Sequence, residues 1–150
     1  MILCDTREQK NAHVIAYFDR HNISYDIRTV HTGDYMDSEK MDITVDRKQN
    51  LEELSGNLCT KNNRFWREVR RSKEEGLKMV VLCEHGGKIR SIKDVANWKS
   101  KYSRVGGKRL MEEIYRVHIA YDVDFYFCDK RSTGRRILEI LGEKQRRERK

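Results

Sequence analysis

The chain has 150 residues, of which 37% are hydrophobic, enough for a single domain with a modest core. Lysine and arginine number 32 against 24 aspartate and glutamate residues, and the resulting net charge of +8 favours a polyanionic partner. No apolar run approaches the roughly 18 residues of a membrane span, and the first residues lack the features of a signal peptide, which excludes an integral membrane protein and indicates a cytoplasmic one.

The hydrophobic pattern predicts strands and helices mixed along the chain. In chain order it indicates a strand at 1–4, a helix at 11–21, a strand at 24–30, a hairpin of strands at 33–36 and 41–48, helices at 51–58 and 63–75, a strand at 78–84, helices at 91–102 and 108–121, a strand at 123–128 and a helix at 133–141. This order favours an α/β sheet covered by helices in one domain, residues 1–142. The charged residues 143–150 are expected to form a disordered tail.

The cysteines agree with a reducing compartment. All four are widely spaced, without a CxxC pair or neighbouring paired histidines, which argues against a zinc site. Three lie in short apolar runs and are interpreted as small buried hydrophobic residues, namely Cys4, Cys83 and Cys128.

Charge is distributed unevenly along the chain. Residues 1–60 contain 11 acidic and 7 basic side chains, whereas residues 61–150 contain 13 acidic and 25 basic side chains. This asymmetry fits either solvated helix faces with a basic tail, or a carboxylate-built metal site beside a surface that binds polyphosphate.

The acidic segment contains one arrangement suited to metal-dependent chemistry. Residues i and i+2 of a strand point to the same face, so Asp46 and Lys48 project together while Arg47 points away. A hairpin closed near residues 38–39 brings Asp34 alongside them. Two carboxylates suit Mg²⁺, and a lysine can orient water or steady negative charge on a phosphate. The same residue types also fit an ordinary solvated strand.

Further charged residues are expected near this arrangement. Asp5, Arg7 and Glu8 follow the first predicted strand at its carboxyl end, where α/β proteins tend to place ligands. Glu52 lies four residues beyond Lys48, in the first turn of the next helix, where its charge also interacts favourably with the helix dipole.

These residues resemble the signature of the XPF-type nuclease domain of structure-specific DNA endonucleases, a branch of the restriction-endonuclease-like group. The signature is a Gly-Asp pair, a spacer, Glu-Arg-Lys, three residues and Asp. In this chain it reads Gly33-Asp34, a spacer, Asp46-Arg47-Lys48, three residues and Glu52. The family's Asp-x-Arg-Glu element is matched by residues 5–8. The two exchanged carboxylates keep their charge and differ from the signature by one methylene.

The resemblance implies a restriction-endonuclease-like fold with a central mixed sheet flanked by helices. It implies that Asp34 and Asp46 bind Mg²⁺ or Mn²⁺ and that Lys48 acts on water or phosphate. The remaining implied site residues have supporting roles; they are Asp5, Arg7, Glu8, Arg47 and Glu52. Arg47 is expected to act structurally or through its backbone, because its side chain points to the opposite face.

The implied activity is hydrolysis of DNA phosphodiester bonds, on branched or flapped DNA, in phage or bacterial replication, recombination or repair. The resemblance also leaves homodimerisation open. The helix face that carries Leu110, Ile114 and Val117 fits either a dimer interface or the core.

Basic residues form two candidate DNA-binding surfaces. One is an arginine stripe on the helix after the site, and the other surrounds a Gly-Gly pair at a helix N-terminus, a position suited to phosphate. Both also fit solvated surfaces or a plain turn. The candidates are Arg64, Arg67, Arg71, Lys99, Lys101, Arg104, Lys108 and Arg109.

Two rival functions remain open. One is a catalytically silent DNA-binding scaffold subunit, because the family contains degenerate partners, and the other is an enzyme acting on RNA. The intact set of Asp34, Asp46 and Lys48 favours an active DNA endonuclease over a scaffold.

Overall fold

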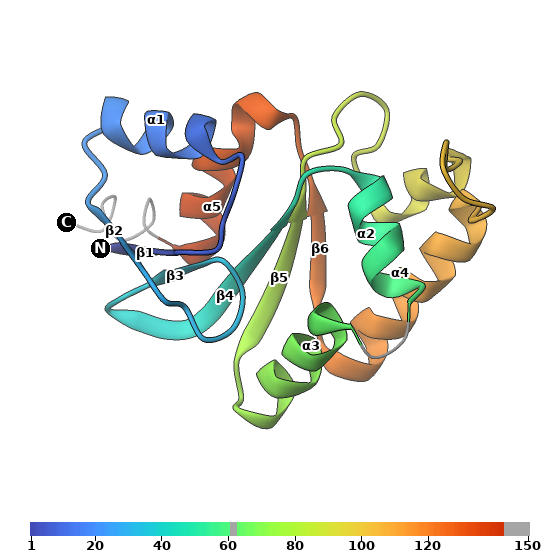
Figure 1. The fold of residues 1–150 in the computed structure, drawn as a ribbon, viewed down its shortest axis with the longest axis horizontal. Coiled ribbons are helices and arrows are strands. Elements are labelled where there is room, and N and C mark those ends of the chain that lie inside the picture. The colour runs from blue at the N-terminus through green and yellow to red at the C-terminus, as the bar shows by residue number, and fades with distance from the viewer. Residues whose placement is uncertain (61–62, 143–150) are drawn as a thin grey trace.

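A six-stranded mixed β-sheet crosses the middle of the molecule (Figure 1). The computed structural model describes residues 1–60 and 63–142. The strand order is β2-β1-β3-β4-β5-β6, in which β3 is antiparallel to both of its neighbours and the other pairs are parallel. The strands are β1 (Ile2–Asp5), β2 (Tyr25–Arg28), β3 (Tyr35–Asp37), β4 (Lys40–Lys48), β5 (Lys78–Cys83) and β6 (Asp124–Phe127).

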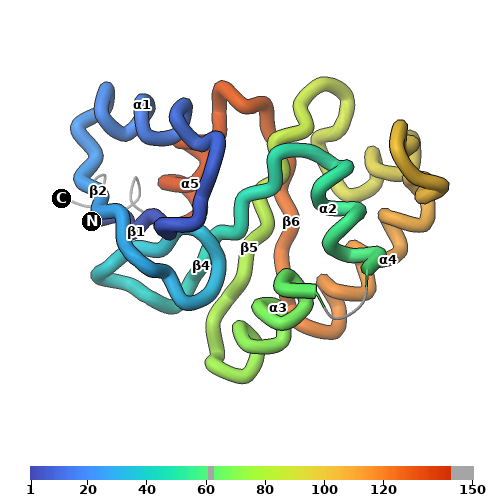
Figure 2. The backbone as a smooth tube through the Cα atoms, viewed as in Figure 1, coloured from blue at the N-terminus to red at the C-terminus, as the bar shows by residue number. Residues whose placement is uncertain are grey.

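Helices cover both faces of this sheet. One face carries α1 and α5, which pack against each other, and the opposite face carries α2, α3, α4 and the short 3₁₀ helix η1. The backbone leaves the sheet after β4, forms α2 and α3, and returns to the sheet as β5 (Figure 2). The helices are α1 (Ala12–Arg20), α2 (Leu51–Leu58), α3 (Arg64–Glu74), η1 (Ile92–Asn97), α4 (Gly107–Tyr121), η2 (Lys130–Ser132) and α5 (Thr133–Leu141).

The central strands are buried because both of their faces are covered. Side chains alternate along a strand, so Val81 and Cys83 pack with α2, α3 and α4, whereas Val45 and Leu82 pack with α1 and α5. Each face of the sheet therefore has its own hydrophobic core. This arrangement also separates the side chains at the end of β4 into two sets on opposite faces.

The expected hairpin and the capping of the following helix are confirmed. β3 and β4 form an antiparallel pair with Tyr35 opposite Val45. The side chain of Asn50 accepts a hydrogen bond of 2.9 Å from the main-chain N–H of Glu53, as an N-cap residue does. The Glu53 carboxylate accepts one from the Gln49 N–H. These bonds fix the start of α2 directly beyond β4.

The helix expected over residues 91–102 is wrong beyond Asn97. Only η1 forms, and its Ser91–Asp94 capping box is present. The chain then extends, and Lys99 forms an antiparallel bridge with Gly106. The physical reason is a close backbone approach: a Cβ at Gly107 would lie 2.1 Å from the carbonyl oxygen of Val95, so α4 begins directly against η1. Tyr102 lies in the intervening loop and is 85% exposed.

The face of α4 that was expected to form either part of the core or a dimer interface is part of the core. Leu110, Ile114 and Val117 are fully buried beneath α4, so this face belongs to the core and is not available to a second copy. Homodimerisation through another surface stays a prediction.

The burial expected for three of the cysteines is found in full for two of them. Cys4 and Cys83 are buried and Cys128 is half-buried, and none of the four cysteines is in a disulfide.

Within residues 1–60 and 63–142, no helix is long and apolar enough to cross a membrane. The tail at 143–150 lies outside the described residues, so its expected disorder stays a prediction.

Candidate active site

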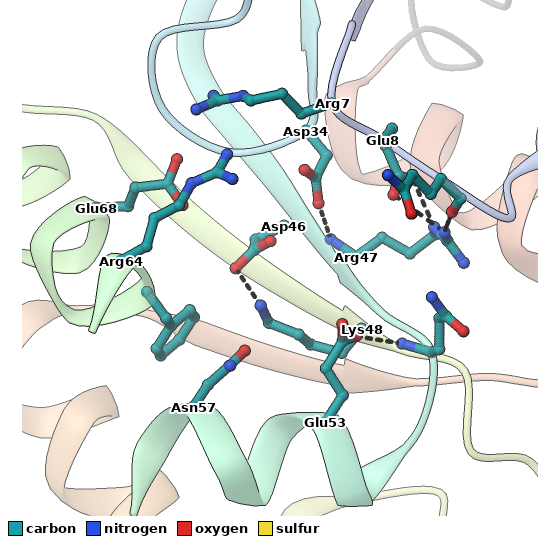
Figure 3. Close-up of a pocket in the computed structure, with 13 residues that line it drawn as sticks. Arg7, Glu8, Asp34, Asp46, Arg47, Lys48, Glu53, Asn57, Arg64 and Glu68 are labelled. Carbon is teal, nitrogen blue, oxygen red and sulfur yellow. Dashed lines mark hydrogen bonds and ion pairs between the residues drawn. The ribbon is translucent and has the colours of Figure 1, made fainter. Parts of the chain in front are cut away.

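A polar pocket lies where β4 ends and α2 and α3 begin (Figure 3). Its volume is about 280 Å³. Six of the eight residues predicted for catalysis and its support line it, together with residues from α2 and α3. The six are Arg7, Glu8, Asp34, Asp46, Arg47 and Lys48. The sequence thus located most of the pocket on three segments that are distant in the chain.

Asp34 and Asp46 meet in this pocket, as the hairpin predicted. The main-chain N–H of Asp34 donates a hydrogen bond of 2.8 Å to the carbonyl oxygen of Val45, which places Asp34 beside Asp46. Burial, followed by the charge of Asp46 and a hydrogen bond between the two carboxyl groups, raises the pKa of Asp34 well above its ordinary value. The two carboxyl groups therefore share one low-dielectric space.

Lys48 extends from β4 toward the same space (Figure 3). Its Nζ lies 3.2 Å from Oδ2 of Asp46 and 4.7 Å from the centre of the Phe65 ring on α3. Burial alone would lower the pKa of Lys48, but the negative charges of Asp46, Glu53 and Asp34 outweigh it and raise that pKa. The ammonium is consequently charged at neutral pH and faces the carboxylates.

The donor set at this point fits a hydrated divalent cation. Oδ2 of Asp46 is buried and contacts Lys48, yet it accepts no hydrogen bond of regular geometry. Two adjacent carboxylates repel one another, and a cation between them would remove that repulsion. In the part of the chain that the structure describes, no cluster of three or more His, Cys, Asp or Glu side chains forms a metal site. Water would complete the ligand set, as Mg²⁺ usually requires.

Arg47 projects to the opposite face of β4, as the alternation predicted. Its guanidinium forms ion pairs with Glu8, at 2.6 Å, and with Glu84, and it donates a hydrogen bond of 2.6 Å to the carbonyl oxygen of Gln9. The main-chain N–H of Arg47 donates a hydrogen bond of 2.8 Å to Oδ2 of Asp34. Arg47 is thus linked to the pocket through its backbone. Its buried side chain connects the loop that follows β1 with Glu84, the residue that follows β5.

The buried pairs around Arg47 extend to both helices of that face. Glu84 also bonds to His13 on α1 and to the hydroxyl of Thr133 on α5. The hydroxyl of Tyr35 donates a hydrogen bond of 2.6 Å to Glu8 and accepts one from Asn11. This network satisfies the buried charges, which would otherwise be costly.

Asp5 is buried behind the pocket and does not line it. Its carboxylate accepts hydrogen bonds from the Val30 N–H, at 3.0 Å, and from Nε of Arg7, at 2.9 Å. Nη2 of Arg7 in turn donates to the carbonyl oxygen of Val30. Asp5 and Arg7 thereby fix the segment that leads from β2 to Asp34.

Glu52 is not brought to the pocket, contrary to its expected place beside the signature residues. Its carboxylate accepts hydrogen bonds from Ser100 Oγ, at 2.7 Å, and from the Lys101 N–H, at 2.8 Å. The neighbouring Glu53 lines the pocket instead. The reason is helical geometry, because successive residues in the first turn of α2 point about 100° apart.

Sequence reasoning missed further polar residues at the site. Glu68 and Asn57 line the pocket from α3 and α2, and the buried Glu84 supports Arg47 from beyond β5. Burial and the charge of Asp46 raise the pKa of Glu68. One signal was available: Glu68 shares the helix spacing of the buried residues Phe65, Val69 and Ser72, a pattern in which a glutamate is unusual.

The predicted DNA-binding residues lie mainly on the surface. Arg64 lines the pocket, with its guanidinium 4.0 Å from Glu68, and Arg67 is exposed on the same helix. Arg71 is half-buried and donates to the carbonyl oxygen of His31, which anchors a loop. The second group is exposed on the loop after η1 and the first turn of α4; it comprises Lys99, Lys101, Arg104, Lys108 and Arg109.

Comparisons with known proteins agree with the fold and the signature. A family model described as "ERCC4 domain" matches residues 4–140. Two solved structures of XPF from Aeropyrum pernix, one in complex with DNA, each superpose with a TM-score of 0.72; their identities are 17% and 15%. Each alignment covers 97% of this chain, which spans 65% and 64% of those longer chains. No curated protein sequence matches this chain significantly. The expected restriction-endonuclease-like fold is confirmed.

Proposed function

We propose, because this chain belongs to the ERCC4 domain family, that it is a metal-dependent endonuclease that hydrolyses phosphodiester bonds in branched or flapped DNA. The observation that supports this most strongly is the convergence of Asp34, Asp46 and Lys48 on one pocket. The XPF structure solved with DNA supports DNA as the polymer. The setting we propose is phage or bacterial DNA replication, recombination or repair.

In this proposal Asp34 and Asp46 hold Mg²⁺ or Mn²⁺. When bound there, such a cation supplies Lewis-acid chemistry at the phosphate. Lys48 is the residue that donates hydrogen bonds to the attacking water or to the phosphate oxygens, because its charged ammonium has three donors and faces the carboxylates. The Phe65 ring restricts the ammonium to that side of the pocket.

The supporting residues act by holding the pocket in shape. Arg47, with Glu8 and Glu84, fixes the end of β4, and the Arg47 N–H orients the carboxylate of Asp34. Asp5 and Arg7 hold the segment before Asp34. We assign Glu52 a different supporting role, because it binds Ser100 and Lys101 and so fixes the loop that carries the second basic group.

DNA would approach along the basic residues that flank the pocket. Arg64 is at the pocket itself, Arg67 follows on α3, and the group at residues 99–109 lies beyond α2, next to Glu52. Exposed lysines and arginines bind phosphates without reading sequence, which suits an enzyme that recognises DNA shape.

The test is an assay of purified protein on labelled flap, fork and linear duplex DNA in Mg²⁺, Mn²⁺ or EDTA. Cleavage of the branched substrates that requires the metal supports the proposal. Binding without cleavage under every condition would favour the scaffold alternative, and stronger competition by RNA than by DNA would favour the ribonuclease alternative.

A further inference from the structure

Glu68 is a buried carboxylate at a helix position where an apolar side chain would be expected. It lies on the buried face of α3, at the spacing that Phe65, Val69 and Ser72 share, and it is only 7% exposed. A buried carboxylate is costly unless it is paired and hydrogen-bonded. An apolar side chain at this position would pack against the sheet without that cost.

The contacts of Glu68 compensate its charge only weakly. Oε1 accepts one long hydrogen bond, 3.3 Å, from the main-chain N–H of Gly33. Oε2 lies 4.0 Å from Nε of Arg64, a half-exposed side chain. Neither contact has the short distance of a charge-assisted hydrogen bond.

Glu68 also faces the carboxylate pair from the opposite wall of the pocket (Figure 3). The charge of Asp46 acts on it directly, and Oδ2 of Asp46 is itself buried without a hydrogen-bond partner. Glu68, Asp34 and Asp46 therefore line one pocket, which Lys48 and Arg64 also line. The three do not form a direct ligand set within the described residues. A water bound to the cation can bridge the remaining gap.

We propose that Glu68 accepts a hydrogen bond from a water of the hydrated divalent cation held by Asp34 and Asp46, and so is a positioning residue of the metal site. This inference rests on the proposed function, because it assumes that cation. It adds a third carboxylate, from a helix outside the signature, to a pair that comes from the hairpin.

The test measures Mn²⁺ binding to the whole chain without DNA, by the electron paramagnetic resonance signal of the free ion. The variant is Glu68→Gln, whose amide oxygen still accepts from the Gly33 N–H while the negative charge is lost. Loss of an outer partner of a metal site weakens metal affinity about 10- to 100-fold, so a shift of that size is expected. Glu74→Gln, an exposed glutamate on the same helix, is the matched control and should bind Mn²⁺ like the wild type.

A thermal melt provides the second readout. Without metal, Glu68→Gln should melt at or above the wild-type temperature, because a buried, weakly paired charge is gone. Saturating Mn²⁺ should raise its melting temperature less than that of the wild type. If Glu68→Gln folds poorly, Glu68→Leu replaces it, because leucine suits the buried face of the helix. Glu68→Leu should show the same weaker Mn²⁺ binding and the same smaller rise in melting temperature.

The outcomes separate this inference from the proposed function. Wild-type protein that binds Mn²⁺ and cleaves DNA, together with Glu68→Gln that binds Mn²⁺ equally well, would overturn the role of Glu68 alone. An equal loss of affinity in Glu74→Gln would also overturn it, because the effect would then be one of overall charge. Wild-type protein that binds no Mn²⁺ would overturn both.

Discussion

The main-chain N–H of Arg47 donates a hydrogen bond of 2.8 Å to Oδ2 of Asp34, while the guanidinium of Arg47 is held on the opposite face of β4 by Glu8 and Glu84. One residue thus connects the carboxylate pocket to the buried ion-pair network. A disturbance of the network reaches the pocket through the backbone of β4. Asp34 and Arg47 are consequently coupled, although the Arg47 side chain points away from the pocket.

Asp46→Asn should lose DNA cleavage and keep DNA binding. The amide removes a negative metal ligand but leaves the shape of the pocket intact. Loss of a residue that only hydrogen-bonds to a metal ligand costs up to about 100-fold in activity, so loss of the ligand itself should lower cleavage by at least about 100-fold. Gel-shift affinity in EDTA should stay within about twofold. The control is Asp42→Asn, an exposed residue of the same strand. Cleavage at the wild-type rate by Asp46→Asn would show that the metal site lies elsewhere.

Arg47→Met should destabilise the fold. It leaves two buried carboxylates without their cation, and breaking a buried ion pair in this way costs about 3–5 kcal/mol. Urea unfolding measures the loss, and Arg20→Met, at an exposed position of α1, should change stability by less than about 0.5 kcal/mol. Adding Glu8→Gln and Glu84→Gln to Arg47→Met should recover part of the loss. If the triple variant is no more stable than Arg47→Met alone, the unpaired buried charges are not the cause of the loss of stability.

Metal-free Asp34→Asn should gain stability over the wild type at neutral pH and less in acid. Burial and Asp46 raise the folded-state pKa of Asp34 above the unfolded value of about 3.9. Between these two pKa values the folded state holds the proton and the unfolded state does not, so the contribution of Asp34 to stability falls as pH rises. Asparagine removes this penalty. Urea unfolding in EDTA at pH 5 and pH 7.5 gives the difference, and a gain that is larger at pH 5 would contradict the assignment.

A triple variant of the second basic group, Lys101→Gln, Arg104→Gln and Lys108→Gln, should weaken DNA binding for every sequence alike. If each residue neutralises one phosphate, the slope of log K against log salt becomes shallower by about 0.9 per residue. The matched control removes three exposed charges outside both basic groups: Arg20→Gln, Arg28→Gln and Arg135→Gln. Equal slopes for the two variants would mean that only total charge matters.

The sequence was sufficient for the carboxylate pair because the relevant interactions are local. Alternation over residues 44–48 and a short turn determine that Asp34, Asp46 and Lys48 share a face, and both features can be recognised without tertiary contacts. The capping of α2 by Asn50 is equally local. For the same reason the position of Arg47 on the opposite face was predicted correctly.

The sequence was insufficient where long-range packing decides. The segment after η1 extends because Gly107 lets the backbone of α4 approach Val95, and Ser100 of that segment binds Glu52. The ion pair between Arg47 and Glu84 joins β4 to the residue that follows β5, and no spacing rule in the sequence connects the two positions. Glu68 could have been found by its place among the buried residues of α3, but its direction toward the carboxylates depends on how α3 packs on the sheet.

Thr133, at the start of α5, bonds to Glu84, and Gly134 lies so close to Tyr17 of α1 that a Cβ there would be 2.7 Å from its ring. During synthesis, the carboxylates of the hairpin leave the ribosome before α5. Glu84, the ion-pair partner of Arg47, therefore gains its hydrogen bond from Thr133 only after residue 133 has been translated and α5 has docked. In the nascent chain, the support of Arg47 would thus be completed later than the carboxylate pair itself.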